Sequence, residues 1–383
     1  MIYRYGTDSG GRRVRVATVY AKDEHSLRKK MISPQALQVV RTLHKAGYQA
    51  YIVGGAVRDL LLNCVPKDFD VATDATPNRI KKIFSNAWII GKRFKLAHVI
   101  FPGRYIVEVT TFRSASSDNF NAVYGTIEED VRRRDFSVNA LFFDPEKEQL
   151  IDYVGGFRDL KARRLSNVIP LNTIFDSDPV RMLRAAKYAA KCDLRIPIRL
   201  RLAIRKKSSL LASVSVSRMT EEFFKILSSG KAELIFRHID KLNLMPYFLP
   251  RVAAATKNEK TAFFDGMREL DLKTNTAQEA CIDREIMLFH FFKPFLPPYN
   301  SPVGYFENFT NAKAFCKSFQ QPLQLPVALI EAAVKLIFEI RDDIRNTGRQ
   351  NGRKKVRRRS GKSRKDKDGD SVSGSDEIKK SGE

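Results

Sequence analysis

Two aspartates separated by a single residue, Asp68 and Asp70, are the first side chains whose types and spacing could do chemistry. We expect them on a short strand, where alternate side chains point to the same face. A third carboxylate, Glu108, lies in an apolar strand pattern, where an unpaired charge is costly. Three carboxylates on adjacent strands could hold two magnesium ions, which would activate an attacking hydroxyl and stabilise a phosphate leaving group. For the aspartate pair alone, a polar strand end at the surface is the alternative.

A glycine pair, Gly54 and Gly55, stands between a predicted strand and a predicted helix. Residues without side chains let backbone N–H groups approach a phosphate closely. Arg58, one turn into the helix, could add a charge to a triphosphate. Taken alone, such a pair is equally consistent with a tight turn.

Two further groups of residues combine basic side chains with carboxylate or amide groups. In the first group, Arg134 and Asp135 are adjacent and Asn139 follows about one helical turn later. Arginine suits phosphate oxygens, whereas Asp and Asn can form hydrogen bonds with ribose hydroxyls. A solvated basic helix face is the alternative. Asp178 and Arg181 are three residues apart on a predicted helix, with Asp178 expected at the N-cap. An N-cap with a local ion pair explains the second group equally well.

The patterns predict an α+β protein, with a small mixed β-sheet first and helices after it. Strand and helix patterns alternate up to about residue 150, and helical patterns such as DPVRMLRAAKYAAKC dominate from about residue 155 to 340. Abundant Phe near Phe291, Phe292 and Phe295 favours core packing over base stacking. The expected divisions are a basic arm (1–35), a mixed-sheet domain (36–150), a helical connection (151–195), a helical body (196–345) and a disordered basic tail (346–383).

The composition favours a polyanionic partner. The chain of 383 residues carries 68 Lys and Arg against 43 Asp and Glu, a net charge of +25, and this positive field makes nucleic acid the first expectation. The four cysteines lie far apart without ligand spacing, which argues against a zinc site or a disulfide framework. No apolar leader or membrane span is recognised, so we expect a cytoplasmic protein.

Six motifs together resemble the class II nucleotidyltransferases, which comprise bacterial poly(A) polymerases and CCA-adding tRNA enzymes. The motifs are, in order, GGAVRDLLL, KDFDV, VEVTTFR, RRDFSVNAL, DYVGGFRDL and DPVRMLRAAKYAA, and they cover roughly residues 36 to 195. The resemblance implies a nucleotidyltransferase head, the mixed-sheet domain, followed by an α-helical neck and an RNA-binding body.

The resemblance also implies roles for individual residues. Two Mg²⁺ ions would be bound by Asp68 and Asp70, with Glu108 as the third catalytic carboxylate. The substrate ATP would be bound by the residues that match the triphosphate, sugar and base motifs: Gly54, Gly55, Arg58, Arg134, Asp135, Asn139, Asp178, Arg181 and Arg184. One residue departs from the family pattern, because Ser177 stands where a glutamate usually precedes the base-reading aspartate. This departure puts the stringency of nucleotide choice in doubt.

Asp178 and Arg181 would select A or C over G or U, because adenine and cytosine both present an amino donor beside a ring-nitrogen acceptor. Residues 89–100 resemble the segment that marks poly(A) polymerases within the family. A basic tail suits RNA 3′ ends of any sequence, and its expected RNA-binding residues are Arg353, Lys354, Lys355, Arg357, Arg358 and Arg359. Poly(A) addition by a monomer is therefore favoured over CCA addition to tRNA, and over a non-catalytic RNA-binding module with a relic head.

Overall fold

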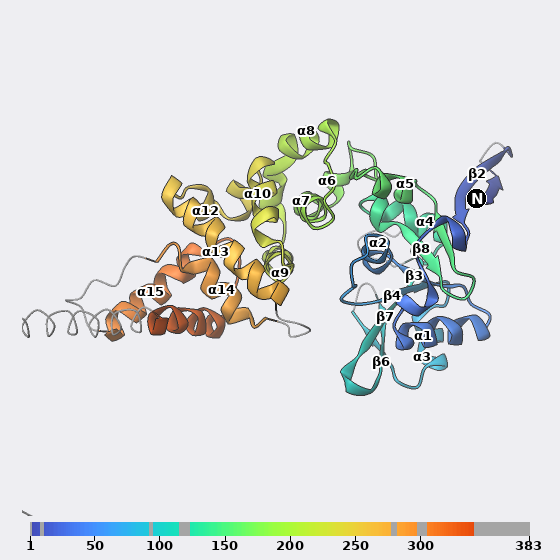
Figure 1. The fold of residues 1–383 in the computed structure, drawn as a ribbon, viewed down its shortest axis with the longest axis horizontal. Coiled ribbons are helices and arrows are strands. Elements are labelled where there is room, and N and C mark those ends of the chain that lie inside the picture. The colour runs from blue at the N-terminus through green and yellow to red at the C-terminus, as the bar shows by residue number, and fades with distance from the viewer. Residues whose placement is uncertain are drawn as a thin grey trace, which may run out of the picture.

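The computed structural model describes residues 2–7, 11–91, 95–114, 123–276, 282–296 and 305–340. Figure 1 shows an elongated arch, with a β-sheet domain at one end, a helical body at the other, and a short run of helices joining them. The mixed sheet followed by helices confirms the predicted α+β class.

Nine strands form one mixed sheet in the order β1-β2-β9-β8-β3-β4-β7-β6-β5. Strands β4 and β7 are parallel, and the other neighbouring strands that the structure describes are antiparallel. The strands are β1 (Ile2–Thr7), β2 (Arg13–Tyr20), β3 (Ala50–Val53), β4 (Asp70–Thr73), β5 (Ala87–Ile90), β6 (Leu96–Ile100), β7 (Ile106–Thr111), β8 (Leu141–Asp144) and β9 (Gln149–Asp152).

The N-terminal segment differs from the loosely attached arm expected for residues 1–35. Strands β1 and β2 form an antiparallel pair, and the end of β2 pairs with β9. Ala17 and Val19 of β2 are buried against the sheet. The prediction was wrong because the partner strand lies more than a hundred residues later, so no local pattern announces it.

One face of the sheet is covered by α1 (Pro34–Lys45) and α3 (Pro77–Ile83). Helix α1 begins where the Ser33 hydroxyl accepts a hydrogen bond from the Ala36 N–H, and it ends before Gly47, as its apolar spacing predicts. Its buried side chains pack on alternate residues of β4, β6 and β7. The intervening residues of these strands therefore face the other way.

Helices α2 (Gly55–Leu61) and α5 (Gly156–Lys161) join the same core as α1, whereas α4 (Ile127–Arg133) packs on the other face of the sheet. The remaining α-helices are α6 (Ile174–Ser177), α7 (Arg181–Lys191), α8 (Ile198–Lys207), α9 (Val216–Leu227), α10 (Ala232–Lys241), α11 (Met245–Phe248), α12 (Pro250–Ala253), α13 (Lys257–Thr276), α14 (Arg284–Phe292) and α15 (Tyr305–Phe319), and residues 327–340 are also helical. Phe291, Phe292 and Phe295 lie in one core that runs from α7 to this last helix, so core packing is confirmed. Among the described helices, none is long and apolar enough to cross a membrane.

A close backbone contact fixes α5 against the residues that lead into β8. A Cβ built on Gly156 would lie 2.1 Å from the Ser137 carbonyl oxygen and 3.2 Å from Leu141 Cδ2. The Asp152 carboxylate accepts hydrogen bonds from backbone N–H groups at the start of α5, which fixes the helix end. Only glycine fits at this crossing.

We therefore expect Gly156→Ala to lower the free energy of unfolding by about 3 kcal/mol, because a backbone carbonyl cannot move aside cheaply. Urea-induced unfolding followed by circular dichroism measures this change. Gly47→Ala is the control: its φ is +85°, but no atom lies within 4 Å of the added Cβ, so only the backbone strain of about 1–2 kcal/mol applies. Equal losses in the two variants would show that the contact at Gly156 is unimportant.

Candidate functional site

A cavity of about 510 Å³ lies where the sheet domain meets α7 and α9. It brings together nearly all the residues singled out in the sequence, from segments more than a hundred residues apart. Its lining residues are Gly54, Gly55, Arg58, Asp68, Asp70, Arg133, Arg134, Asp135, Asn139, Asp178, Arg181, Arg184, Lys187, Tyr188 and Lys225. Glu108 is not among them.

The two aspartates reach the cavity from the start of β4, an interior strand of the sheet. Strand β4 begins at Asp70, so Asp68 lies just before the strand and is exposed, which differs from the expected DxD strand. Burial, followed by repulsion from Glu108 and then from Asp68, raises the pKa of Asp70 to about 7. Carboxylates that repel one another in this way would be relieved by a bound cation.

Glu108 is the direct neighbour of Asp70 on the parallel strand β7. Its carboxylate lies 3.6 Å from His98 Nε2 on β6. Within the described parts of the chain, no group of three or more His, Cys, Asp or Glu is placed to hold a metal ion. The expected three-carboxylate cage is therefore not formed, and the residues fit a site in which Asp68 and Asp70 share magnesium ions with substrate phosphates, as Mg²⁺ commonly binds.

The glycine pair and Arg58 form one wall of the cavity. Gly54 has a φ of +69°, and a Cβ there would lie 3.4 Å from Arg134 Nη1, so both its backbone conformation and its surroundings favour glycine. Arg58 is buried and donates to Asp59 Oδ1 through Nε and Nη2 and to Asn139 Oδ1 through Nη1, at 2.6 to 2.9 Å. Its guanidinium is therefore held rigidly beside the glycines.

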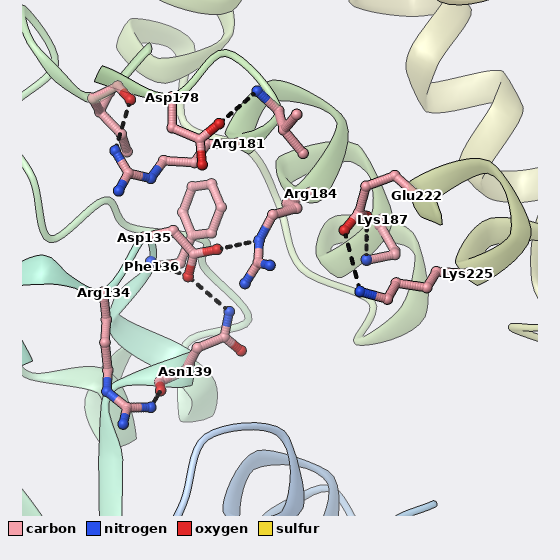
Figure 2. Close-up of polar contacts among 12 residues, drawn as sticks. Arg134, Asp135, Phe136, Asn139, Asp178, Arg181, Arg184, Lys187, Glu222 and Lys225 are labelled. Carbon is pink, nitrogen blue, oxygen red and sulfur yellow. Dashed lines mark hydrogen bonds and ion pairs between the residues drawn. The ribbon is translucent and has the colours of Figure 1, made fainter. Parts of the chain in front are cut away.

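Asp135 connects this wall with helix α7. Its Oδ1 accepts from Phe136 N at 2.8 Å and from Asn139 Nδ2 at 3.1 Å, and its Oδ2 accepts from Arg184 Nε at 2.7 Å, as Figure 2 shows. Burial alone would raise the pKa of Asp135, but Arg184 and these hydrogen bonds lower it below its usual value. Both oxygens are thus engaged within the protein, which indicates that Asp135 orients Arg184 and Asn139.

Further arginine side chains line the cavity beside Arg58. Arg134 is paired with Asp130 and donates to the Asn139 carbonyl oxygen, whereas Arg133 has a pKa lowered by burial and then by repulsion, chiefly from Arg113. Burial also lowers the pKa of Arg181, although the charge of Asp178 opposes this effect. Arginine side chains crowded together in this way form a site for an anion.

Asp178 and Arg181 point into the cavity but are not paired with each other by a hydrogen bond (Figure 2). Arg181 Nη1 donates to Ser177 Oγ at 2.6 Å and to the Ile174 carbonyl at 3.0 Å. Asp178 accepts from Val180 N at 3.2 Å and from Arg218 Nη2 of α9 at 2.8 Å. The N-cap expected at Asp178 was wrong, because α7 begins only at Arg181 and has Val180 at its N-cap.

Sequence reasoning did not single out four of the lining residues, namely Arg133, Lys187, Tyr188 and Lys225. Tyr188 follows Arg181 by seven residues and Arg184 by four, so the helical period could have revealed it. Lys225 comes from α9, and Glu222 of the same helix forms a buried ion pair with Lys187. No local pattern links α9 to α7. The six expected RNA-binding residues of the tail lie outside the described residues.

Comparisons with known proteins agree with this geometry. Residues 50–166 match the family described as "Poly A polymerase head domain", and residues 193–256 match the one described as "Probable RNA and SrmB- binding site of polymerase A". Poly(A) polymerase I of Haemophilus influenzae is 40% identical over 251 residues, which cover 61% of this chain and 55% of the relative. The CCA-adding enzyme of Bacillus licheniformis is 39% identical over 204 residues, which cover 52% and 51%.

The fold is also shared with solved structures. The Bacillus stearothermophilus CCA-adding enzyme in complex with CTP has a TM-score of 0.55 at 24% identity, covering 80% of this chain and 83% of that one. The Thermotoga maritima CCA-adding enzyme with tRNA has a TM-score of 0.54 at 19% identity, covering 84% and 85%.

The chain spans about half the length of the relatives that it matches in sequence. The matched residues nevertheless include the glycine pair, both aspartates and the Asp135 network. Residues 50–166 thus match the head-domain family of poly(A) polymerases, and the chain is similar in sequence to both bacterial poly(A) polymerases and CCA-adding enzymes.

Proposed function

We propose that this protein transfers AMP from ATP to the 3′ hydroxyl of RNA without a template, releasing pyrophosphate. The observation that carries the proposal is the division of charge in the 510 Å³ cavity. Asp68 and Asp70 lie at the start of β4, and arginines from α2, α4, α7 and the residue after α4 line the remaining space. A nucleoside triphosphate needs both, because its metal-bridged phosphates require carboxylates nearby and its free phosphate oxygens require cations.

The chemistry is an in-line displacement at the α-phosphorus of ATP. The 3′ oxygen forms a bond to this phosphorus, the bond to the β-phosphate breaks, and the hydroxyl proton leaves to solvent. Magnesium ions held by Asp68 and Asp70, when bound, would activate the hydroxyl and stabilise the leaving pyrophosphate. Arg58 and Arg134 hold the triphosphate against the glycine wall, and Asn139 fixes the orientation of Arg58.

The base would lie beside Asp178 and Arg181. Adenine presents an amino donor to the Asp178 carboxylate and a ring-nitrogen acceptor to the Arg181 guanidinium. Arg218 and Val180 fix the carboxylate, and Ser177 and the Ile174 carbonyl fix the guanidinium. Guanine or uracil would leave these groups unpaired, at about 1 to 3 kcal/mol for each.

CCA addition to tRNA is the second candidate, because cytosine presents the same donor and acceptor pattern. It is supported by the CCA-adding relative that is 39% identical. Poly(A) addition is favoured by the basic tail and by the resemblance of residues 89–100 to poly(A) polymerases. Both candidates share the cavity and the reaction, so they differ in the nucleotide and RNA that are accepted.

The test is extension of a labelled generic RNA and of a tRNA lacking its 3′ end, with magnesium and each single nucleotide triphosphate. Long ladders on both RNAs with ATP alone would support poly(A) addition. Products confined to a few C and A residues on the tRNA would support CCA addition. Absence of any extension, with RNA binding retained, would support a non-catalytic RNA-binding protein.

We expect Asp70→Asn to lower the rate of extension by about 10³-fold or more, since loss of a metal-binding charge removes several kcal/mol of transition-state stabilisation. RNA affinity should stay within about twofold, because the phosphate-binding arginines remain. Gel assays and filter binding measure the two quantities. Asp74→Asn, at the other end of the same strand, is the control and should extend RNA normally. An Asp70→Asn protein that retains activity would contradict the assigned role.

Ser177→Ala should weaken the choice of nucleotide, because Arg181 loses the hydroxyl that accepts its hydrogen bond. We expect the ratio of kcat/KM for ATP to that for UTP to fall about tenfold, which corresponds to one hydrogen bond to a charged group. Single-nucleotide extension kinetics measure this ratio. Ser213→Ala removes a similar hydroxyl that donates to the carbonyl three residues earlier, and it should leave the ratio unchanged. An unchanged ratio in Ser177→Ala would mean that the Ile174 carbonyl suffices to orient Arg181.

A further inference from the structure

An exposed apolar strip lies on the outer face of strands β5, β6 and β7. Trp88 has 66% of its surface exposed, and Ile90, Ile100 and Ile106 are also exposed. Large apolar side chains grouped on one sheet face and open to solvent indicate a binding surface. The strip falls within residues 89–100 and their neighbours, the segment whose role the nucleotide cavity does not explain.

The register of the sheet places this strip in line with the carboxylates. Trp88 pairs with His98, His98 pairs with Glu108, and Glu108 pairs with Asp70. Directly paired residues on neighbouring strands point to the same face of a sheet. The side chains of Trp88, His98, Glu108 and Asp70 therefore form one row across four strands.

The residues next to this row face the opposite way. Ala87, Val99 and Val107 are each buried at 5% exposure or less in the core under α1 and α3. The alternation is regular, so the exposure of Trp88 is a property of the sheet face and is not caused by a frayed strand end. The outer row thus runs from an exposed indole directly to the proposed catalytic centre.

We propose that this strip is the platform for the RNA 3′ end, with a base of the terminal nucleotides stacked on Trp88. The inference rests on the proposed function and adds to it the surface that binds the primer. The nucleotide cavity is lined by Asp70 together with the glycine pair and the arginines, whereas Trp88, His98 and Glu108 are not among its lining residues. The attacking 3′ hydroxyl must reach Asp70 from another direction, and the row on β7, β6 and β5 provides one.

The distances suit this arrangement. Three strand spacings of about 4.8 Å separate Asp70 from Trp88, which gives about 14 Å. This length corresponds to roughly two to four nucleotides, depending on whether the strand is extended or stacked. An aromatic side chain at that distance would stack on an internal base near the end and leave the terminal hydroxyl free. Such stacking accepts any base, as a template-independent enzyme requires.

His98 lies between the platform and the carboxylates. Its Nε2 is 3.6 Å from Glu108 Oε2, and its side chain is only 23% exposed. The ring therefore separates the apolar strip from the carboxylate pair and orients Glu108. His98 is a positioning residue in this arrangement.

Tryptophan fluorescence tests the platform directly, because Trp88 is the single tryptophan of the 383-residue chain. We expect a short oligoadenylate, added without magnesium or ATP, to quench the emission saturably and to protect Trp88 from acrylamide. Four further oligonucleotides each carry an abasic site at a different one of the last four positions. Only the oligonucleotide whose abasic site falls at the stacked position should fail to quench the emission and to protect Trp88. Emission that stays unchanged while the same RNA binds would overturn the platform and leave the strip as a protein contact.

Kinetics provide the second measurement. Trp88→Ala should raise the KM for RNA about tenfold and leave the KM for ATP unchanged, and Trp88→Phe should keep most of the affinity. Leu272→Ala removes an exposed apolar side chain from α13 in the body and should change neither value. An RNA KM for Trp88→Ala within twofold of the unsubstituted protein would also overturn the inference.

The outcomes separate the platform from the proposed function. Normal extension with no effect of RNA on Trp88 would reject the platform alone. Position-dependent protection of Trp88 without any extension would reject the proposed activity and keep the RNA-binding surface.

Discussion

The buried carboxylate of Asp135 joins the two halves of the site. Its two oxygens hold a loop of the sheet domain through Phe136 and Asn139 and hold α7 through Arg184. Together with the Lys191–Asp59 ion pair, this contact fixes α7, and with it Arg181, relative to the sheet domain that carries Asp70. A carboxylate with almost no exposure is stable there only because every oxygen has a partner and Arg184 supplies the opposite charge.

Ion pairs also join the helical connection, residues 151–195, to the helical body, residues 196–345. Glu222 of α9 is buried against Lys187 of α7, and Arg218 of α9 holds the outer oxygen of Asp178. The body thus contributes the ion-pair partners of Lys187 and Asp178, both of which line the cavity. The position of α9 relative to α7 therefore affects the orientation of Asp178.

Local patterns in the sequence were sufficient for the parts of the site that are contiguous in the chain. The glycine pair lies at the predicted turn from strand to helix, and the cavity includes both aspartates as well as Asp178 and Arg181, although Asp68 precedes β4 and Asp178 precedes α7. Contacts between distant segments could not be predicted in this way, and these include the β2–β9 pairing, the Lys187–Glu222 ion pair and the Arg218 contact. The row from Trp88 to Asp70 depends on the register of three strand pairs, which only the folded sheet reveals.

The pairing of β2 with β9 has a consequence for how the protein emerges from the ribosome. Residues 18–20 find their partners at residues 150–152, so the second strand to be synthesised cannot complete its hydrogen bonds until the last strand of the sheet has left the exit tunnel. During that interval β2 has a free edge, and the basic side chains in β1 and β2, such as Arg4 and Arg13, would discourage pairing between nascent chains. The N-terminal hairpin therefore cannot dock on β9 before the loop that carries Asp135 has been synthesised.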